Sequence, residues 1–358
     1  MPAKKTASSH PIPARTVLSR NCKSIALLIG NGINRASKGT AGISWDELMN
    51  RLVEQAALNS ASPARTRGEL RRLRESNNLE QKPVSLPEMF DIIEATGTRA
   101  SASGSARSTD DDLQYCLITL LKQMRPSTPH TRVAQWAQKH QVPVMTTNYD
   151  HCLQDALVDP KCLQKRLRLG RTFSEFYPWD RYYSPTKLAD PARGFGIWHI
   201  HGDQELPCSI RAGLDQYMGI VERLRKHKRK VAREFLLGLD EDPKQDPAYY
   251  RVPWLRIFLG KKLWIEGLGL HGDEVSLRWL LIQRFRYWKK YKPRDCHTSG
   301  WYIHGPTSIP QVGILDDQRR CFLESVGLSV IEIAAPEDMY DTLFAIPRQR
   351  PKQNRIAE

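Results

Sequence analysis

Short runs of almost continuously apolar residues recur along this 358-residue chain, with helical patterns between them. Such runs are typical of strands in a parallel sheet, because helices cover both of its faces. The sequence therefore predicts an α/β fold with a doubly wound, mostly parallel, Rossmann-like sheet. The expected strands are Ser24–Gly30, Val142–Thr147, Gly196–His201, Lys262–Gly267, Trp301–His304 and Leu328–Ala334. The expected helices outside the segment 60–125 cover about 44–58, 130–139, 150–158, 215–238, 274–290 and 316–326.

The segment 60–125 contains helical patterns and no convincing strand pattern. Its expected helices lie near 64–76, 86–95 and 110–123, and small residues at 97–109 predict a mobile loop. We expect this segment to be a helical insertion within a single domain that covers residues 21–346. The first 20 residues are expected to be flexible, and the basic tail 347–358 to be disordered.

The net charge of +15 is compatible with a nucleic-acid partner, an anionic substrate or simple solubility. Basic residues gather at 65–74, 223–233 and 284–294, although such clusters are more often solvated helix faces than binding sites. No apolar run approaches the roughly 20 residues of a membrane span, and no secretory signal is visible at the N-terminus. The seven cysteines show no C-x-x-C spacing, which predicts neither a disulfide framework nor a zinc ribbon and favours a cytoplasmic protein.

Two glycine-rich turns follow expected strands. Gly30–Asn34 directly follows the first strand, where glycines allow the backbone to approach a phosphate. Glu266–Asp273 contains a G-x-G-x-x-G pattern after a later strand, but no acidic residue lies about 20 positions further on. Each turn alone is a weak signal. Together, at the same edge of one sheet, they suggest a dinucleotide site.

Polar residues end two further strands. Thr146–Asp150 places hydroxyls and the carboxamide of Asn148 at a strand end, with Asp150 where a helix N-cap should lie. His199–Asp203 contains two histidines that would share one face of a strand. His201, before Gly202, is the candidate general base, and His199 is expected to pack or to form hydrogen bonds. A metal site of His199, His201 and Asp203 is the alternative for this stretch.

These four stretches, in this order, resemble the sirtuin fold, and more closely the sirtuin-like domains of bacterial antiphage NAD hydrolases. Sirtuins carry Gly-Ala-Gly-Ile-Ser, Thr-Gln-Asn-x-Asp, His-Gly and a late strand that ends in glycine. The matching stretches are Gly30–Asn34, Thr146–Asp150, His201–Gly202 and Gly267–Gly269, which span about 70% of the chain. Asn31, Asn34 and Thr147 replace the usual Ala, Ser and Gln, and the four-cysteine zinc module of deacylases is missing. The resemblance therefore implies NAD cleavage rather than protein deacylation.

The resemblance also implies roles for individual residues, with NAD as substrate and no metal. Asn148 would orient the ribose and the attacking water, and a neutral His201 would accept a proton. The residues implied in NAD binding are Gly30, Asn31, Gly32, Asn34, Thr147, Asp150, Gly267, Gly269 and Asp273. Cleavage of the nicotinamide–ribose bond would drain the NAD of an infected cell.

Two alternatives stay open at this point. The first is a nucleic-acid or partner-binding module with a degenerate sirtuin fold, which the basic charge motivates. The second is the metal-dependent hydrolase that uses His199, His201 and Asp203. For the leading hypothesis, control through a homo-oligomer is expected, because an unregulated NAD hydrolase would poison its own cell. Family resemblance suggests a HerA-type ATPase or an Argonaute-like protein as a further partner.

Overall fold

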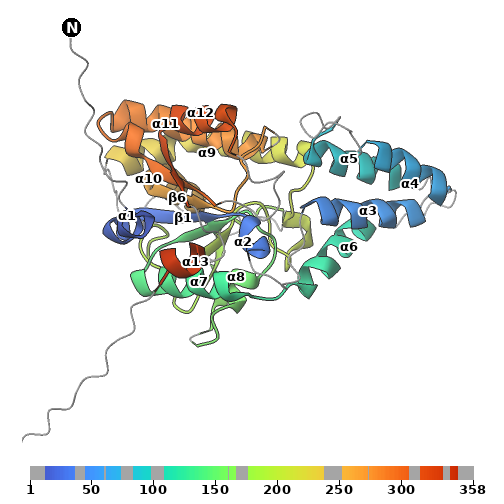
Figure 1. Ribbon diagram of the computed structural model, residues 1–358, viewed down its shortest axis with the longest axis horizontal. Coiled ribbons are helices and arrows are strands. Elements are labelled where there is room, and N and C mark those ends of the chain that lie inside the picture. Colours follow the sequence, from blue (N-terminus) through green and yellow to red (C-terminus); the bar gives the residue numbers. More distant parts are fainter. Residues whose placement is uncertain are drawn as a thin grey trace, which may run out of the picture.

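The computed structural model describes most of the chain and places its elements around one central sheet (Figure 1). The described residues are 13–36, 45–59, 62–73, 84–97, 109–159, 161–166, 176–237, 252–272, 274–305, 315–333 and 339–345. Asp273, Ser44, the loop at 98–108 and the tail from residue 346 lie outside these ranges. The expectations for the loop and for the tail therefore stay predictions.

The sheet has eight strands in the order β3-β4-β5-β2-β1-β6-β7-β8, and those from β5 to β8 in this order run parallel. After β1, the strands β2 and β5 are added on one side of it, and β6 is then added on its other side. This change of direction places a topological switch point between β1 and β6, as in Rossmann-like folds. The predicted α/β, mostly parallel fold class is confirmed. The strands are β1 Ile25–Ile29, β2 Val144–Thr146, β3 Leu163–Arg166, β4 Arg181–Ser184, β5 Ile197–His199, β6 Lys262–Glu266, β7 Gly300–His304 and β8 Leu328–Glu332.

Helices cover both faces of the sheet, which explains the continuous apolar strands (Figure 1). One face packs against α9 Leu214–Leu237, α10 Pro253–Gly260, α11 Val275–Tyr291 and α12 Asp317–Ser325. The other packs against α1 Ala14–Asn21, α7 Thr128–His140, α8 Cys152–Asp155 and α13 Met339–Leu343. All five residues of β1 are fully buried between these two layers.

The remaining long helices form a separate helical unit beside the sheet (Figure 1). They are α3 Trp45–Asn59, α4 Pro63–Arg72, α5 Leu86–Gly97 and α6 Thr109–Gln123. The unit has its own apolar core, to which α3 contributes Leu48 and Leu52. It therefore begins at α3 rather than at residue 60 as predicted. No strand lies in its described residues, as expected.

Several elements differ from the prediction. Strands β3 and β4 were not predicted; they pair antiparallel at the edge of the sheet, and β3 is polar and largely exposed. Helix α10 is buried on all sides, so it lacks the polar face that marks an amphipathic helix. Helix α1 covers residues that were expected to be flexible, because Leu18 anchors it in the core. None of the described helices combines the length and the apolar character that a bilayer crossing requires.

The last residue of β6, Glu266, is fully buried in the sheet. Trp264 Nε1 donates to its Oε2 over 3.4 Å, and Oε1 has no partner among the described residues. Burial raises the pKa of the Glu266 carboxyl to about 8. The folded state therefore holds a proton that the unfolded chain releases at a lower pH.

We expect Glu266→Gln to remove a pH dependence of stability. Because the folded pKa is raised, the contribution of Glu266 is fully present below the unfolded value of 4.5 and is lost as pH rises through about 8. At pH 8 the variant should be more stable by an amount on the order of a few kcal/mol, and the two proteins should converge near pH 5. Urea unfolding at both pH values measures this difference. Parallel pH curves for the two proteins would contradict the assignment.

Candidate active site

The turns after β1 and β6 pack directly on each other. Gly32 N donates to Gly267 O over 2.8 Å, and Gly30 N donates to Glu266 O over 2.9 Å. A Cβ on Gly32 would lie 2.6 Å from Gly267 Cα, and Gly267 itself has a φ of +71°. Glycine is thus required here by a close approach of two backbones. The expected contact of these turns with phosphate stays a prediction, because the amides of Gly30 and Gly32 already donate within the protein.

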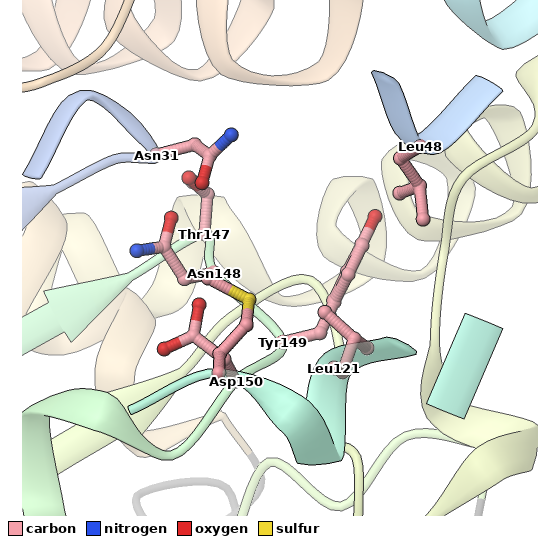
Figure 2. Close-up of a pocket in the computed structure, with 8 residues that line it drawn as sticks. Asn31, Leu48, Leu121, Thr147, Asn148, Tyr149 and Asp150 are labelled. Atoms are coloured by element: carbon pink, nitrogen blue, oxygen red, sulfur yellow. The ribbon is translucent and has the colours of Figure 1, made fainter. Parts of the chain in front are cut away.

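A pocket opens at the carboxyl ends of β1 and β2, beside the switch point. Its volume is about 380 Å³, including its open mouth. Figure 2 shows a polar side and an apolar side. Asn31, Thr147, Asn148 and Asp150 form the polar side, and Leu48, Leu121, Met124 and Tyr149 complete the wall. The structure therefore brings together four of the predicted site residues.

Asn148 stands at the centre of the polar side (Figure 2). Its backbone is held by Thr146 Oγ1, which accepts from Asn148 N over 3.0 Å. Asn148 Nδ2 approaches Gly30 O at 3.5 Å, a weak contact. Asn148 Oδ1 is buried and has no hydrogen-bond partner among the described residues. A buried acceptor without a partner is costly, and one that lines a pocket can be satisfied by a ligand or a water that enters it.

A chain of hydrogen bonds fixes Asp150. His130 Nδ1 accepts from Ser127 N over 3.1 Å, so the other ring nitrogen, Nε2, carries the proton of the neutral ring. Burial lowers the pKa of His130 to about 4, which keeps it neutral. His130 Nε2 then donates to Asn34 Oδ1 over 2.7 Å, and Asn34 Nδ2 donates to Asp150 Oδ2 over 2.9 Å. The predicted binding residue Asn34 thus acts on the pocket indirectly, by orienting Asp150.

His201 lies behind the pocket wall rather than in it. It is not among the lining residues, and its ring packs on Tyr217 with centroids 5.3 Å apart. Tyr217 in turn hydrogen-bonds to the pocket residue Tyr149, whose pKa burial raises well above its usual value. Burial lowers the pKa of His201 to about 4. The imidazole is therefore neutral at pH 7, as its predicted role requires.

The predicted shared face of His199 and His201 is wrong. Strand β5 ends at His199, and the backbone turns at Gly202, whose φ is +129°. His199 Nδ1 donates to Asn148 O over 2.8 Å, since a carbonyl only accepts. His199 Nε2 accepts from Gln154 Nε2 over 3.0 Å. His199 therefore supports the backbone of Asn148, whereas His201 packs elsewhere.

The potential metal ligands differ from the predicted set. His151, His199 and Asp203 place one donor atom each within 4.8 Å of one another, and His201 is not part of the group. His151 Nε2 is 2.7 Å from Asp203 Oδ1, and Tyr183 OH donates to Asp203 Oδ2 over 2.7 Å. A metal ion here would have to displace these hydrogen bonds. A second group, of His130, Asp150 and Cys152, overlaps the chain that fixes Asp150.

The second glycine turn lies apart from the pocket lining. Gly269 O accepts from Arg319 Nη1 over 3.1 Å, and a Cβ on Gly269 would meet the ring of His271 at 2.5 Å. Gly267 and Gly269 are not among the lining residues, and Asp273 is not described. Their contact with the adenosine ribose stays a prediction.

We expect His199→Ala to reduce stability more than activity. The substitution leaves Asn148 O and the Gln154 amide without their buried partner, which costs on the order of 1–3 kcal/mol. Urea unfolding measures this cost, and the rate of nicotinamide release measures activity. A larger loss of rate from His199→Ala than from His201→Ala would reverse the assignment of the two histidines.

Sequence reasoning missed several residues that build this region. His130 comes from a capping box at the start of α7, formed with Ser127, and Ser-x-x-His is a recognisable variant of that motif. Leu48, Leu121 and Met124 come from the helical unit or directly follow it, and nothing in a single sequence pairs that unit with β2.

A scan of the sequence against models of known protein families finds no match, and a search of curated proteins finds no similar sequence.

Proposed function

We propose that this protein hydrolyses NAD at the bond between nicotinamide and ribose. The observation that carries the proposal is Asn148 Oδ1, a buried acceptor without a partner among the described residues, on a residue that lines the pocket beside the switch point. In open α/β sheets, ligands bind outside the carboxyl ends of the strands at such a point. The resemblance of the four motifs to sirtuin-like NAD hydrolases supports the same substrate.

The pocket suits the nicotinamide–ribose end of the dinucleotide. Leu48, Leu121 and Met124 offer an apolar surface to a flat ring, and Asn31, Thr147 and Asn148 offer polar groups to ribose hydroxyls. The pocket is small, since its space of about 380 Å³ includes the open solvent at its mouth. We therefore expect it to take one end of NAD, with the remainder along the turns at Gly30 and Gly267.

The chemistry follows from the charges that develop. As the C1′–N1 bond breaks, its electron pair neutralises the nicotinamide ring, and positive charge builds on the ribose. A carboxylate at Asp150, held by Asn34, stabilises that charge. Asn148 Oδ1 accepts a hydrogen bond from the ribose or from the attacking water. The water oxygen bonds to C1′, and its proton passes to a base. His201 is the predicted base, but it lies behind the pocket wall, so the proton would reach it only through Tyr149 and Tyr217.

Incubation of the purified protein with NAD tests the proposal. Chromatography should show nicotinamide and ADP-ribose in equal amounts, and the reaction should not need added metal. The assay is repeated with a HerA-type ATPase or an Argonaute-like partner, since assembly is the expected control. Absence of nicotinamide release under all of these conditions would contradict the proposal. A stoichiometric metal on the purified protein, with loss of activity on chelation, would favour a metal-dependent hydrolase.

We also expect the protein to be a homo-oligomer. NAD depletion fits a role in antiphage defence, and such an enzyme must be silent in a healthy cell. We expect the helical unit, which is not needed to complete the sheet, to contact a second copy. Light scattering measures the mass. A monomer of 41.0 kDa, fully active alone at physiological NAD, would remove the argument for assembly.

A further inference from the structure

Two of the three basic clusters of the sequence meet on neighbouring helices. Helices α9 and α11 pack side by side on one face of the sheet (Figure 1). Lys228 on α9 donates to Gln283 Oε1 on α11 over 2.6 Å, and its ammonium lies 4.6 Å from the ring centroid of Trp279. We call the cations around this contact the basic patch. It consists of Arg225, Lys228, Arg229, Arg286, Lys289 and Lys290.

The cations of the basic patch lie close enough to repel one another. The pKa of Lys228 is lowered first by burial and then by Arg225 on its own helix and Arg286 on α11. Arg229 and Arg286 both act on the pKa of Tyr287, which burial raises and these two cations lower. Lys289 and Lys290 follow Arg286 by three and four residues, so they lie on the same side of α11.

Nearby carboxylates do not neutralise the basic patch. Helix α11 contains no acidic residue from Val275 to Tyr291. On α9, Glu222 pairs with Lys226 over 3.3 Å, outside the patch. Among the residues that the structure describes, no carboxylate forms an ion pair with a patch residue. Not every residue of the third cluster belongs to this surface, since Arg284 is fully buried and donates to Phe258 O.

The first basic cluster shows the contrast. On α4, Arg65 pairs with Glu69 over 2.8 Å, and both Arg67 and Arg71 pair with Glu54. That surface is therefore partly neutralised by its own carboxylates. In the basic patch, no described carboxylate offsets the cations, so the surface attracts an anionic partner.

We infer that the basic patch binds the phosphate backbone of duplex DNA. The patch occupies about one turn on each of two packed helices, so it presents a compact cationic surface to the closely spaced phosphates of a duplex. Trp279, Tyr287 and Tyr291 pack against the core, so they offer no splayed rings on which unpaired bases could stack. The contacts are to phosphates, and binding is independent of base sequence and sensitive to salt. This activity does not depend on the pocket or on the proposed NAD cleavage.

Fluorescence anisotropy with a labelled duplex of about three helical turns tests the inference. The wild-type protein should bind with a Kd of roughly 10⁻⁴–10⁻⁶ M at physiological salt. Arg225→Glu, Arg229→Glu and Arg286→Glu combined should weaken binding at least about tenfold and lower the slope of log Kd against log salt by about 3. A matched control reverses the same number of exposed lysines elsewhere, at Lys122, Lys139 and Lys187.

The control should bind almost as well as the wild type. An equal loss of affinity in the control would show that DNA is attracted by net charge alone, and it would overturn the assignment of the basic patch as the binding site. Tighter binding to a single strand of the same sequence, or to vesicles that contain phosphatidylserine, would also overturn the inference. Circular dichroism verifies folding of each variant. The corresponding triple alanine variant, which removes charge without reversing it, replaces any variant that does not fold.

Discussion

Asn148→Ala is expected to abolish nicotinamide release while the protein stays folded. The carboxamide lines the pocket, its Oδ1 has no partner among the described residues, and its Nδ2 makes only a weak contact with Gly30 O. Its removal takes away the group that orients ribose and water, and it also removes a buried polar atom that is not satisfied. We therefore expect stability to be unchanged or slightly higher, because a functional site often costs stability. Chromatography of the products and thermal unfolding measure the two effects.

A matched control for this substitution is Gln135→Ala, which removes an exposed carboxamide on α7, away from the pocket lining. The control should keep both activity and stability. Asn148→Ala with near-full turnover would show that the motif after β2 is not catalytic. A large loss of stability without a matching loss of turnover per folded molecule would assign Asn148 a structural role instead.

His201→Ala is expected to lower the rate about 10²–10⁴-fold, the usual contribution of a positioned acid or base. Because the pKa of His201 is about 4, the ring stays neutral over the range in which most enzymes are assayed. Activity that needs the neutral ring of His201 should therefore fall only when the pH drops through about 4. The wild-type rate should therefore show no inflection from His201 between pH 6 and 9.

Rates for His201→Ala, His201→Asn and His199→Ala at several pH values test this expectation. An inflection near pH 6.5 that disappears in His201→Ala would show that the ring is more solvated in the working enzyme. An unchanged rate in His201→Ala would show that this histidine only packs on Tyr217. The proton acceptor would then have to be sought among the groups that line the pocket.

The parallel core of the sheet was predictable from the sequence because its strands are apolar throughout. β1, β2 and β6 to β8 all lie within one or two residues of the expected positions. The edge strands β3 and β4 were not, since four-residue strands such as Leu163–Arg166 carry no period that distinguishes them from loops. Helix α10 was missed because burial on every side removes helical amphipathicity.

The polar half of the pocket was also predictable, and the apolar half was not. Thr147, Asn148 and Asp150 follow one strand, and parallel topology brings Asn31 to the same edge. Leu48 and Leu121 lie in helices whose apolar residues serve mainly their own core, so no local pattern marks the ones that reach a pocket. The link from His130 to Asn34 spans 96 residues, a separation over which a single sequence gives no pairing signal.

Leu48 and Leu121 belong to the helical unit, whereas the groups opposite them belong to the sheet. The wall is thus shared between two packed bodies, and a rotation of one against the other changes its width. A protein bound to the helical unit and a ligand in the pocket would then respond to the same displacement. Thermodynamic linkage makes this coupling reciprocal: if the bound protein changes the affinity for the ligand by some factor, the ligand changes the affinity for that protein by the same factor. The cellular NAD level would in that case act as an effector of assembly as well as a substrate.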